Sequence, residues 1–136
     1  MSLVYAQDQT LTVADYVGVL SLTTMHDHRP LANAARIQAM LDGANFIVTA
    51  RESDGTVIGL ARCITDHAWI CYCAELAVRD THQGLGIGKR LLETAKEILG
   101  PGIGLNLISE PEAMGFYQRI GMEQYPAFFL PRTDRS

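Results

Sequence analysis

The sequence has no long hydrophobic run and no excess of basic residues. Its longest uninterrupted apolar segment runs from Ala68 to Ala74, far short of the roughly 20 residues that a membrane-spanning helix requires. Eleven Lys and Arg residues against fifteen Asp and Glu residues give a formal net charge of −4, which argues against a nucleic acid held through its phosphates. The N-terminus also lacks the basic and then apolar segments of a secretory signal. We therefore expect a soluble, unexported protein with neither a membrane nor a nucleic acid as its partner.

Cysteine is scarce as well, with only Cys63, Cys71 and Cys73. An odd number of cysteines in a chain of this size is typical of a reducing compartment, and we expect the cytoplasm. No second cysteine pair and no suitably spaced histidine completes a zinc site, so no metal is expected. Apolar residues, in contrast, make up 48% of the 136 residues. That content supports one core, and we expect a single domain over residues 1–136.

The hydrophobic pattern predicts a mixture of helices and strands. Apolar residues recur at helical spacing in four places, namely residues 12–22 with Thr12 as a cap, residues 31–41, the segment after Gly88 that ends at Gly100-Pro101, and residues 111–119. Strands are predicted from β-rich runs at residues 3–6, 45–51, 56–63, 68–78, 103–108 and 125–130. The last of them is expected at a sheet edge because Pro126 interrupts it.

The most informative segment holds three glycines within five residues, Gly84, Gly86 and Gly88, between a predicted strand and a helix. Such glycines let successive amide N–H groups point into one concavity, and the helix adds the positive end of its dipole. The pattern predicts an anion site, with a ligand-free turn as the alternative. A Walker A loop is excluded because Gly88-Lys89 is followed by Arg90. A dinucleotide fingerprint fits poorly because Gly88 follows Gly86 by two positions rather than three.

The loop matches a different pattern, Gln/Arg-x-x-Gly-x-Gly/Ala, at Gln83, Gly86 and Gly88. Together with residues 76–92 and the later segment 113–122, in that order, it resembles the GNAT superfamily of acyl-CoA-dependent N-acetyltransferases. The resemblance extends over residues 45–130. It implies a mixed, mostly antiparallel central sheet of about six or seven strands flanked by about four helices. It also implies acetyl-CoA as co-substrate and a homodimer as a candidate assembly.

The resemblance places the cofactor on one strand and the loop that follows it. The pantetheine arm is expected beside Leu76, Ala77 and Val78, with an N–H group near Leu76 polarising the thioester carbonyl. The pyrophosphate is expected on the loop residues Gln83, Gly84, Leu85, Gly86, Ile87 and Gly88. Lys89 and Arg90 at the start of the helix either reach the phosphates or are solvated.

Two residues are predicted to move protons. Tyr117 stands where the resemblance implies the general acid that protonates the departing CoA thiolate, with a packing role as the alternative. An alkylamine with a pKa of about 10.4 is almost fully protonated at pH 7, so a base would help. Glu75 lies in an otherwise apolar strand, where burial would raise its pKa toward neutrality and suit it to that task. The alternative for Glu75 is a structural pair with Arg62 on the neighbouring strand.

Tyr72 and Glu110 are weaker candidates for the base. Strand parity, in the absence of a bulge, places Tyr72 on the face of Leu76 and Glu75 on the opposite face. Acceptor choice is expected to depend on the polar segment around His26 and His28 and on residues 125–129.

The predicted function is transfer of an acetyl group from acetyl-CoA to the primary amine of a small molecule, by direct attack in a ternary complex. A looser resemblance, carried by residues 57–67, Glu75 and the Phe116-Tyr117 helix, is to a bacterial and plastid subgroup that includes arylalkylamine acetyltransferases. It favours a small amine over a protein amine. The alternatives are an acetyltransferase that acts on a protein amine and a non-catalytic acyl-CoA-binding sensor.

Overall fold

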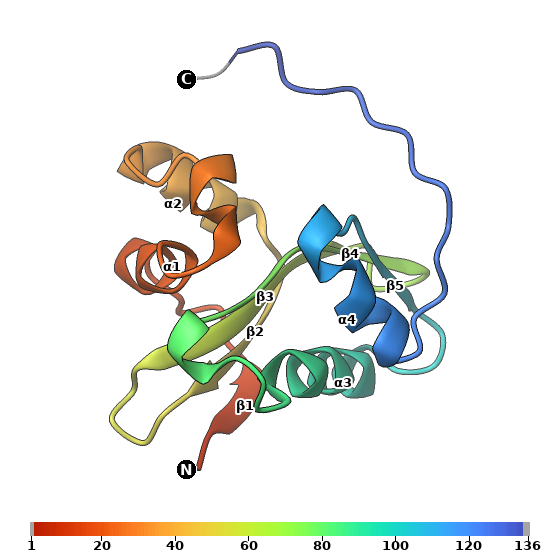
Figure 1. Ribbon diagram of the computed structural model, residues 1–136, viewed down its shortest axis with the longest axis horizontal. Helices are drawn as coiled ribbons and strands as arrows, with labels where there is room; N and C mark the ends of the chain where they lie inside the picture. The colour runs from red at the N-terminus through yellow and green to blue at the C-terminus, as the bar shows by residue number, and fades with distance from the viewer. Residues whose placement is uncertain (1, 135–136) are drawn as a thin grey trace.

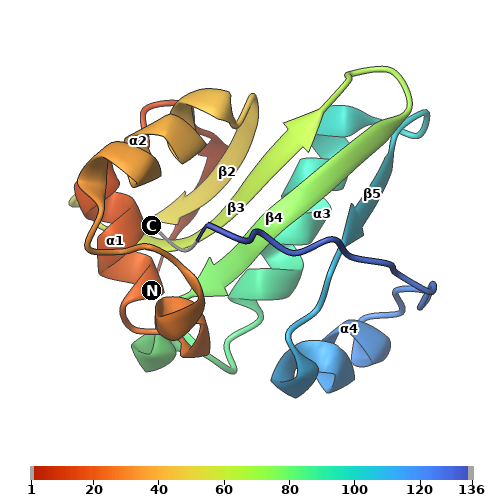
Figure 2. The same cartoon turned by 90° about the horizontal axis from the view of Figure 1, so that it is seen from above.

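The computed structural model describes residues 2–134, which form one five-stranded sheet with helices on both faces (Figures 1 and 2). The spatial order of the strands is β1-β2-β3-β4-β5; β1 to β4 pair antiparallel, and β4 and β5 pair in parallel. The strands are β1 Val4–Gln7, β2 Phe46–Arg51, β3 Val57–Thr65, β4 Ile70–Val78 and β5 Gly104–Leu107. The α-helices are α1 Val13–Leu20, α2 Ala34–Gly43, α3 Ile87–Leu99 and α4 Met114–Arg119, with short 3₁₀ helices η1 Thr24–His28, η2 Asp80–His82 and η3 Pro111–Ala113. The predicted mixed, mostly antiparallel sheet with four helices is confirmed.

The predicted number of strands is too high, because residues 125–130 form no strand in the described chain. This segment leaves the end of α4 and runs extended, away from the sheet (Figure 1). Pro126 cannot donate a ladder hydrogen bond. As a result β5 is the last strand of the sheet among residues 2–134, and its outer edge has no neighbouring strand within that range.

Helix ends follow the local signals in the sequence. The Thr12 hydroxyl accepts a hydrogen bond from the Asp15 N–H at 3.1 Å, and the Asp15 carboxylate accepts one from the Thr12 N–H at 3.3 Å, so α1 begins with a capping box. The side-chain oxygen of Asn33 caps α2 by accepting a hydrogen bond from the Arg36 N–H at 3.0 Å. Gly100, at φ +86°, ends α3 where Pro101 cannot continue it.

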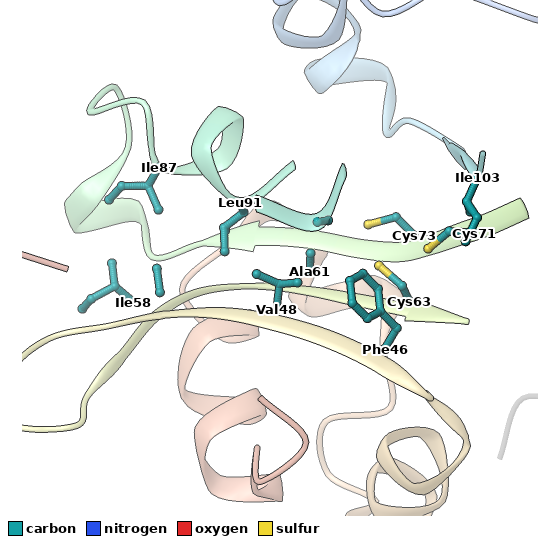
Figure 3. Packing of buried hydrophobic residues seen from close by; sticks show 12 residues of the cluster. Phe46, Val48, Ile58, Ala61, Cys63, Cys71, Cys73, Ile87, Leu91 and Ile103 are labelled. Carbon is teal, nitrogen blue, oxygen red and sulfur yellow. The ribbon is translucent and has the colours of Figure 1, made fainter. Parts of the chain in front are cut away.

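Two apolar clusters fill the space between the sheet and its helices. On one face, α3 packs through Leu91 and Ala95 onto a cluster that includes Phe46 and the three free cysteines (Figure 3). On the other face, α1 and α2 pack onto β2, β3 and β4 through a list of buried residues that includes Tyr16, Val19, Leu20, Ile37, Ile47 and Leu60. Helices therefore cover both faces of the central strands.

An irregularity in β4 positions the candidate site. Arg62 of β3 lies opposite Glu75, whereas the next residue, Cys63, lies opposite Cys73, so Ala74 is an extra residue that forms a β-bulge. The bulge turns Glu75 toward α1, where it meets Tyr16. The predicted parity, with Glu75 opposite the face of Tyr72, is therefore wrong, because the bulge shifts every later residue of β4 by one position.

Strands β4 and β5 also separate along their length. Their pairing runs from Ile70–Gly104 to Cys73–Leu107 and stops there, although β4 continues to Val78. The second half of β4 therefore has β3 on one side and no strand on the other. Sequence patterns do not show such a separation, and it opens the cleft that most of the predicted cofactor residues line.

Candidate active site

A cleft of about 460 Å³ opens where β4 and β5 separate. This volume lies within the range of roughly 300–1,000 Å³ that is usual for small-molecule sites. The walls come from the second half of β4, the end of β5, the glycine loop, α4, and the segment around η1. The residues used below line it as follows: Arg29, Cys73 to Val78, Gln83, Gly84, Gly86, Ile87, Gly88, Glu110, Phe116 and Tyr117.

The backbone of β4 presents unpaired groups to this cleft. Hydrogen-bonding direction alternates along a strand, and the Arg79 N–H donates to Ile58 O on β3 at 2.9 Å. The groups two residues earlier, at Ala77, thus also face β3, and those of Leu76 and Val78 face the open edge. In agreement, Val78 O accepts a hydrogen bond from the Gln83 side chain at 3.3 Å. The strand predicted to hold the pantetheine arm therefore has a free amide at Leu76.

The glycine loop forms an open N-terminus for α3. Gly84 and Gly86 both have φ +79°, a conformation that disfavours residues with a side chain. Gly86 is the N-cap of α3 and no side chain caps the helix; the first bond that enters it runs from the Arg90 N–H to Gly86 O at 3.1 Å. The amides of Ile87 and Gly88 in the first turn have no acceptor within the helix, and the helix dipole favours an anion beside them.

Gly88 is needed for close packing rather than for its backbone angle. A Cβ atom at this position would lie 3.2 Å from Cζ of Phe116 and 3.7 Å from Cδ2 of Leu76. The start of α3 therefore approaches α4 closely across the base of the cleft. This contact brings the two motifs singled out in the sequence, the loop and the tyrosine helix, to one site.

Three of the predicted phosphate contacts are not among the lining residues of the cleft, namely Leu85, Lys89 and Arg90. Leu85 is 61% exposed. The Arg90 guanidinium lies 5.6 Å from the centre of the Tyr5 ring and 3.5 Å from the Glu97 carboxylate. Contacts of these three residues with a phosphate stay predictions.

Glu75 is fully enclosed and heavily hydrogen-bonded. Its carboxylate is 1% exposed and accepts hydrogen bonds from Nε of Arg62 at 2.6 Å, from Nη2 of Arg62, and from the Tyr16 hydroxyl at 2.7 Å. Nε of Arg29 lies 3.3 Å from the same carboxylate. Burial alone would raise the pKa of Glu75, but these donors and the two guanidinium charges lower it below its ordinary value. The expected rise is wrong, and the structural pair with Arg62 is present.

Arg29 and Tyr16 are the members of this network that the sequence did not predict. Tyr16 has the spacing of a core residue in α1, and Arg29 lies in a polar segment after η1. Arg29 also donates a hydrogen bond to Ala74 O at 3.2 Å, so it ties this segment to the bulge of β4. The one signal in the sequence was indirect: a buried carboxylate requires several donors, and Arg62 alone does not supply them.

Tyr117 and Glu110 lie in the same cleft and remain available to a ligand. Burial, with smaller contributions from neighbouring Cys73 and Glu110, raises the pKa of Tyr117 to about 12. Its hydroxyl makes no hydrogen bond to any residue between 2 and 134, and its ring packs edge-on against Phe116 at 5.1 Å. One Glu110 carboxylate oxygen lies 3.2 Å from Nδ1 of His28.

Within residues 2–134 no group of three or more His, Cys, Asp and Glu side chains is arranged to hold a metal ion. None of the helices in this range has the length and apolar character needed to cross a membrane.

Strands β4 and β5 separate beside the glycine loop, where α3 begins without a capping side chain, and Tyr117 lines the cleft between them. This arrangement defines an acyltransferase type of fold. Residues 42–124 match the family model described as the acetyltransferase (GNAT) domain, and the chain belongs to this family. It is 33% identical over 102 residues to a histone acetyltransferase of Glycine max, covering 71% of this chain and 44% of that protein. The chain spans less than two thirds of the length of the curated relatives it matches.

Solved structures agree on the fold. A GNAT family acetyltransferase from Streptococcus pneumoniae has a TM-score of 0.73 at 22% identity, with 99% of this chain and 100% of that chain covered. An aminoglycoside N-acetyltransferase in complex with CoA has a TM-score of 0.69 at 18% identity, with 99% and 96% covered. At these identities the similarity supports the fold alone. The nature of the acceptor has to be argued from the residues of the cleft.

Proposed function

We propose that the protein transfers an acetyl group from acetyl-CoA to the primary amine of a small molecule, which attacks the thioester directly in a ternary complex. The observation on which this proposal rests is the separation of β4 and β5 beside the start of α3, which begins at Gly86 without a capping side chain. One cleft then offers a strand-like edge, an anion cradle and a phenol. We further propose that the protein acts in the cytoplasm, a reducing compartment in which its three buried, free cysteines are stable.

Acetyl-CoA would use both parts of the cleft at once. Its pantetheine amides would pair with the open groups of Leu76 and Val78, in the way an added strand binds a sheet edge. Its pyrophosphate would accept hydrogen bonds from the first-turn amides at Ile87 and Gly88, with the glycines leaving room for the approach. The Leu76 N–H then stands beside the thioester, where it would stabilise the oxyanion that forms on attack.

Two groups that line the cleft, Tyr117 and Glu110, would carry out the proton transfers. The Tyr117 hydroxyl, whose raised pKa keeps it protonated at neutral pH, would donate to the departing thiolate. The acceptor ammonium must lose a proton before attack, and Glu75 is a poor base because its carboxylate is occupied and its pKa is lowered. We propose that Glu110 accepts this proton, directly or through a water molecule.

A small, cationic acceptor fits the charges at this end. Glu110 and Glu112 both line the cleft, whereas the charge of Arg29 is held by Glu75. Arg119 also lines the cleft, but the two carboxylates outnumber it and favour an ammonium group. The aminoglycoside enzyme of similar fold acts on such amines, and the histone acetyltransferase relative makes a protein amine the alternative.

The proposal is tested by cofactor binding and by thiol release. Calorimetry should detect saturable binding of acetyl-CoA, and free thiol should appear when a panel of primary amines is added. The Gly88→Val variant should weaken acetyl-CoA binding about tenfold or more, because its side chain would displace Phe116 from the loop. Gly102→Val is the matched control, since a Cβ there has no neighbour within 4 Å. Absence of binding would contradict the proposal, and binding without thiol release would leave the non-catalytic sensor.

The assignment of the base is tested by comparing two carboxylates. Glu110→Gln should lower kcat/KM for the amine about 100-fold and remove the acidic limb of its pH profile, with acetyl-CoA affinity unchanged. Glu97→Gln, a change at an exposed site on α3, is the control and should leave both parameters unaltered. If Glu75→Gln instead removes the acidic limb while the protein stays folded, the base is Glu75, as the sequence predicts.

A further inference from the structure

Among residues 2–134, the bulge residue Ala74 pairs with no residue of the neighbouring strands. On the β3 side, Arg62 lies opposite Glu75. The next pair joins Cys63 to Cys73, so the register passes over Ala74. On the other side, the pairing with β5 ends at Cys73. The extra residue of a bulge is left out of the ladder of hydrogen bonds, and its carbonyl oxygen then needs a donor from elsewhere.

Arg29, which follows η1, supplies this donor. Its Nη2 donates a hydrogen bond to Ala74 O at 3.2 Å, and its Nε lies 3.3 Å from the Glu75 carboxylate. Its Nη1 donates to His28 O at 3.0 Å, within its own segment. A guanidinium is planar and holds its donors in a fixed arrangement. One rigid group therefore joins a carbonyl of β4, a buried carboxylate and the segment around η1.

The Glu75 carboxylate is a firm anchor for Arg29. Two hydrogen bonds from Arg62 and one from the Tyr16 hydroxyl fix its orientation. The Arg29 side chain is itself only 21% exposed and lines the cleft. Solvent and salt screen such a pair less than a pair on the open surface. Arg29 is therefore held in one place against β4, at the wall of the cleft.

The free N–H of Leu76 belongs to the second of two successive peptide units that are held in this manner. The first unit joins Ala74 to Glu75, and its carbonyl oxygen accepts the hydrogen bond from Arg29. The second joins Glu75 to Leu76, and its carbonyl oxygen accepts a hydrogen bond from Cys73 Sγ at 3.2 Å. Because a peptide unit is planar, the direction of the Glu75 carbonyl also sets the direction of the Leu76 N–H. A rotation of the first unit would move the second, and the contact with Arg29 opposes that rotation.

We propose that Arg29 is a positioning residue, which holds the bulge of β4 so that the Leu76 N–H stays directed into the cleft. The inference rests on the proposed acetyl transfer, in which this N–H stabilises the oxyanion. Such a donor is effective only when it points to the place where the charge develops, and a misplacement of about 1 Å can cost roughly 100-fold in rate. Arg29 acts through the backbone, and the Glu75 carboxylate serves as its anchor.

Kinetics of the Arg29→Met variant test the proposal. We expect kcat to fall about tenfold, with the KM of the amine and the acetyl-CoA dissociation constant within about twofold of the parent values, because the lost interaction is made in the transition state. Arg29→Lys should recover little, since an ammonium does not span Ala74 O and the Glu75 carboxylate as a planar fork does. Arg36→Met is the matched control, at an exposed arginine of α2 outside the cleft, and should leave all three values unaltered. An unchanged kcat in Arg29→Met, or a change confined to the KM of the amine, would overturn the proposal.

The Tyr16→Phe variant separates positioning of the bulge from general support of Glu75. It removes one donor to the buried carboxylate and leaves the hydrogen bond from Arg29 to Ala74 O in place. Urea denaturation should therefore show a loss of stability, whereas kcat should stay within about twofold of the parent value. A fall in kcat as large as that of Arg29→Met would show that any weakening of the network slows the reaction, and would contradict a specific role of Arg29.

The Leu76 amide resonance provides a measurement that does not require turnover. In the isotope-labelled parent protein, the amide proton should shift downfield on saturation with acetyl-CoA, as the N–H meets the thioester carbonyl. In Arg29→Met saturated with acetyl-CoA, the shift should be much smaller. If the parent protein shows this difference but releases no thiol with any amine, the proposed transfer is wrong and the positioning by Arg29 is retained. Equal shifts in the two proteins would refute the positioning role whether or not the protein turns over.

Discussion

The Arg62→Met variant is expected to lose about 3–5 kcal/mol of unfolding free energy, because it leaves the Glu75 charge buried without its main partner. Glu75 is 2% exposed and Arg62 is 8% exposed. Arg62 supplies two of the hydrogen bonds to the carboxylate, and neither Tyr16 nor Arg29 can replace both. Urea denaturation of the two proteins at pH 7 measures the loss. Arg90→Met is the matched control and should change stability by less than about 1 kcal/mol, since the Arg90–Glu97 pair is exposed.

The pH dependence of this loss has a definite sign. In the parent protein the network lowers the pKa of Glu75 below its ordinary 4.5, so its stabilisation is present above pH 4.5 and is lost as the pH falls through the lower folded value. In Arg62→Met the charge and the two hydrogen bonds that stabilise the Glu75 carboxylate are gone, so burial raises the pKa of Glu75. The difference between the two proteins should therefore shrink as the pH falls. Protonation of Glu75 relieves the variant between its raised pKa and about pH 4.5, and below about pH 4.5 protonation weakens the parent. A difference that stays constant with pH would show that lost packing, rather than charge, explains the destabilisation.

Features that depend on neighbouring residues could be predicted from the sequence. The capping box of Thr12 and the end of α3 at Gly100 each rest on a few adjacent side chains. The glycine loop is similar, because its three glycines and the helix after them already specify a concave set of amides. These local features predict an anion cradle, and the family resemblance extends that prediction to cofactor contacts on one strand and one loop.

Features that depend on distant segments could not be predicted. The bulge at Ala74 leaves no mark in the alternation of β4, yet it decides which way Glu75 points. Burial of Glu75 was evident from its apolar neighbours, but the sign of its pKa shift was not, because Tyr16 and Arg29 come from other elements.

The segment 125–130 shows a different limit. Its aromatic residues favour a strand, but a strand also requires the edge of a sheet to pair with. In the described chain the only edge near the segment is that of β5, and the segment does not lie along it. The mistaken strand and the exposed aromatic side chains of residues 125–130 are therefore two aspects of one observation, a segment with the composition of a strand and no strand to pair with.

Tyr117→Phe is expected to lower kcat about 100-fold or more and to leave the acetyl-CoA dissociation constant nearly unchanged. The phenylalanine ring keeps the edge-on contact with Phe116, so the cleft retains its shape and only the proton donor is lost. Because the pKa of Tyr117 is raised to about 12, the proposed activity of the parent protein should show no loss of turnover from this group up to about pH 10.

The matched control is Tyr5→Phe, which removes a hydroxyl on β1 outside the cleft and should leave kcat unaltered. Single-turnover measurements separate the chemical step from product release. The thiolate must leave unprotonated in the variant, so the defect should appear in the chemical step and grow with pH, where water and buffer protonate the thiolate less readily. Unchanged turnover in Tyr117→Phe would remove the acid role and leave Tyr117 as a packing residue against Phe116.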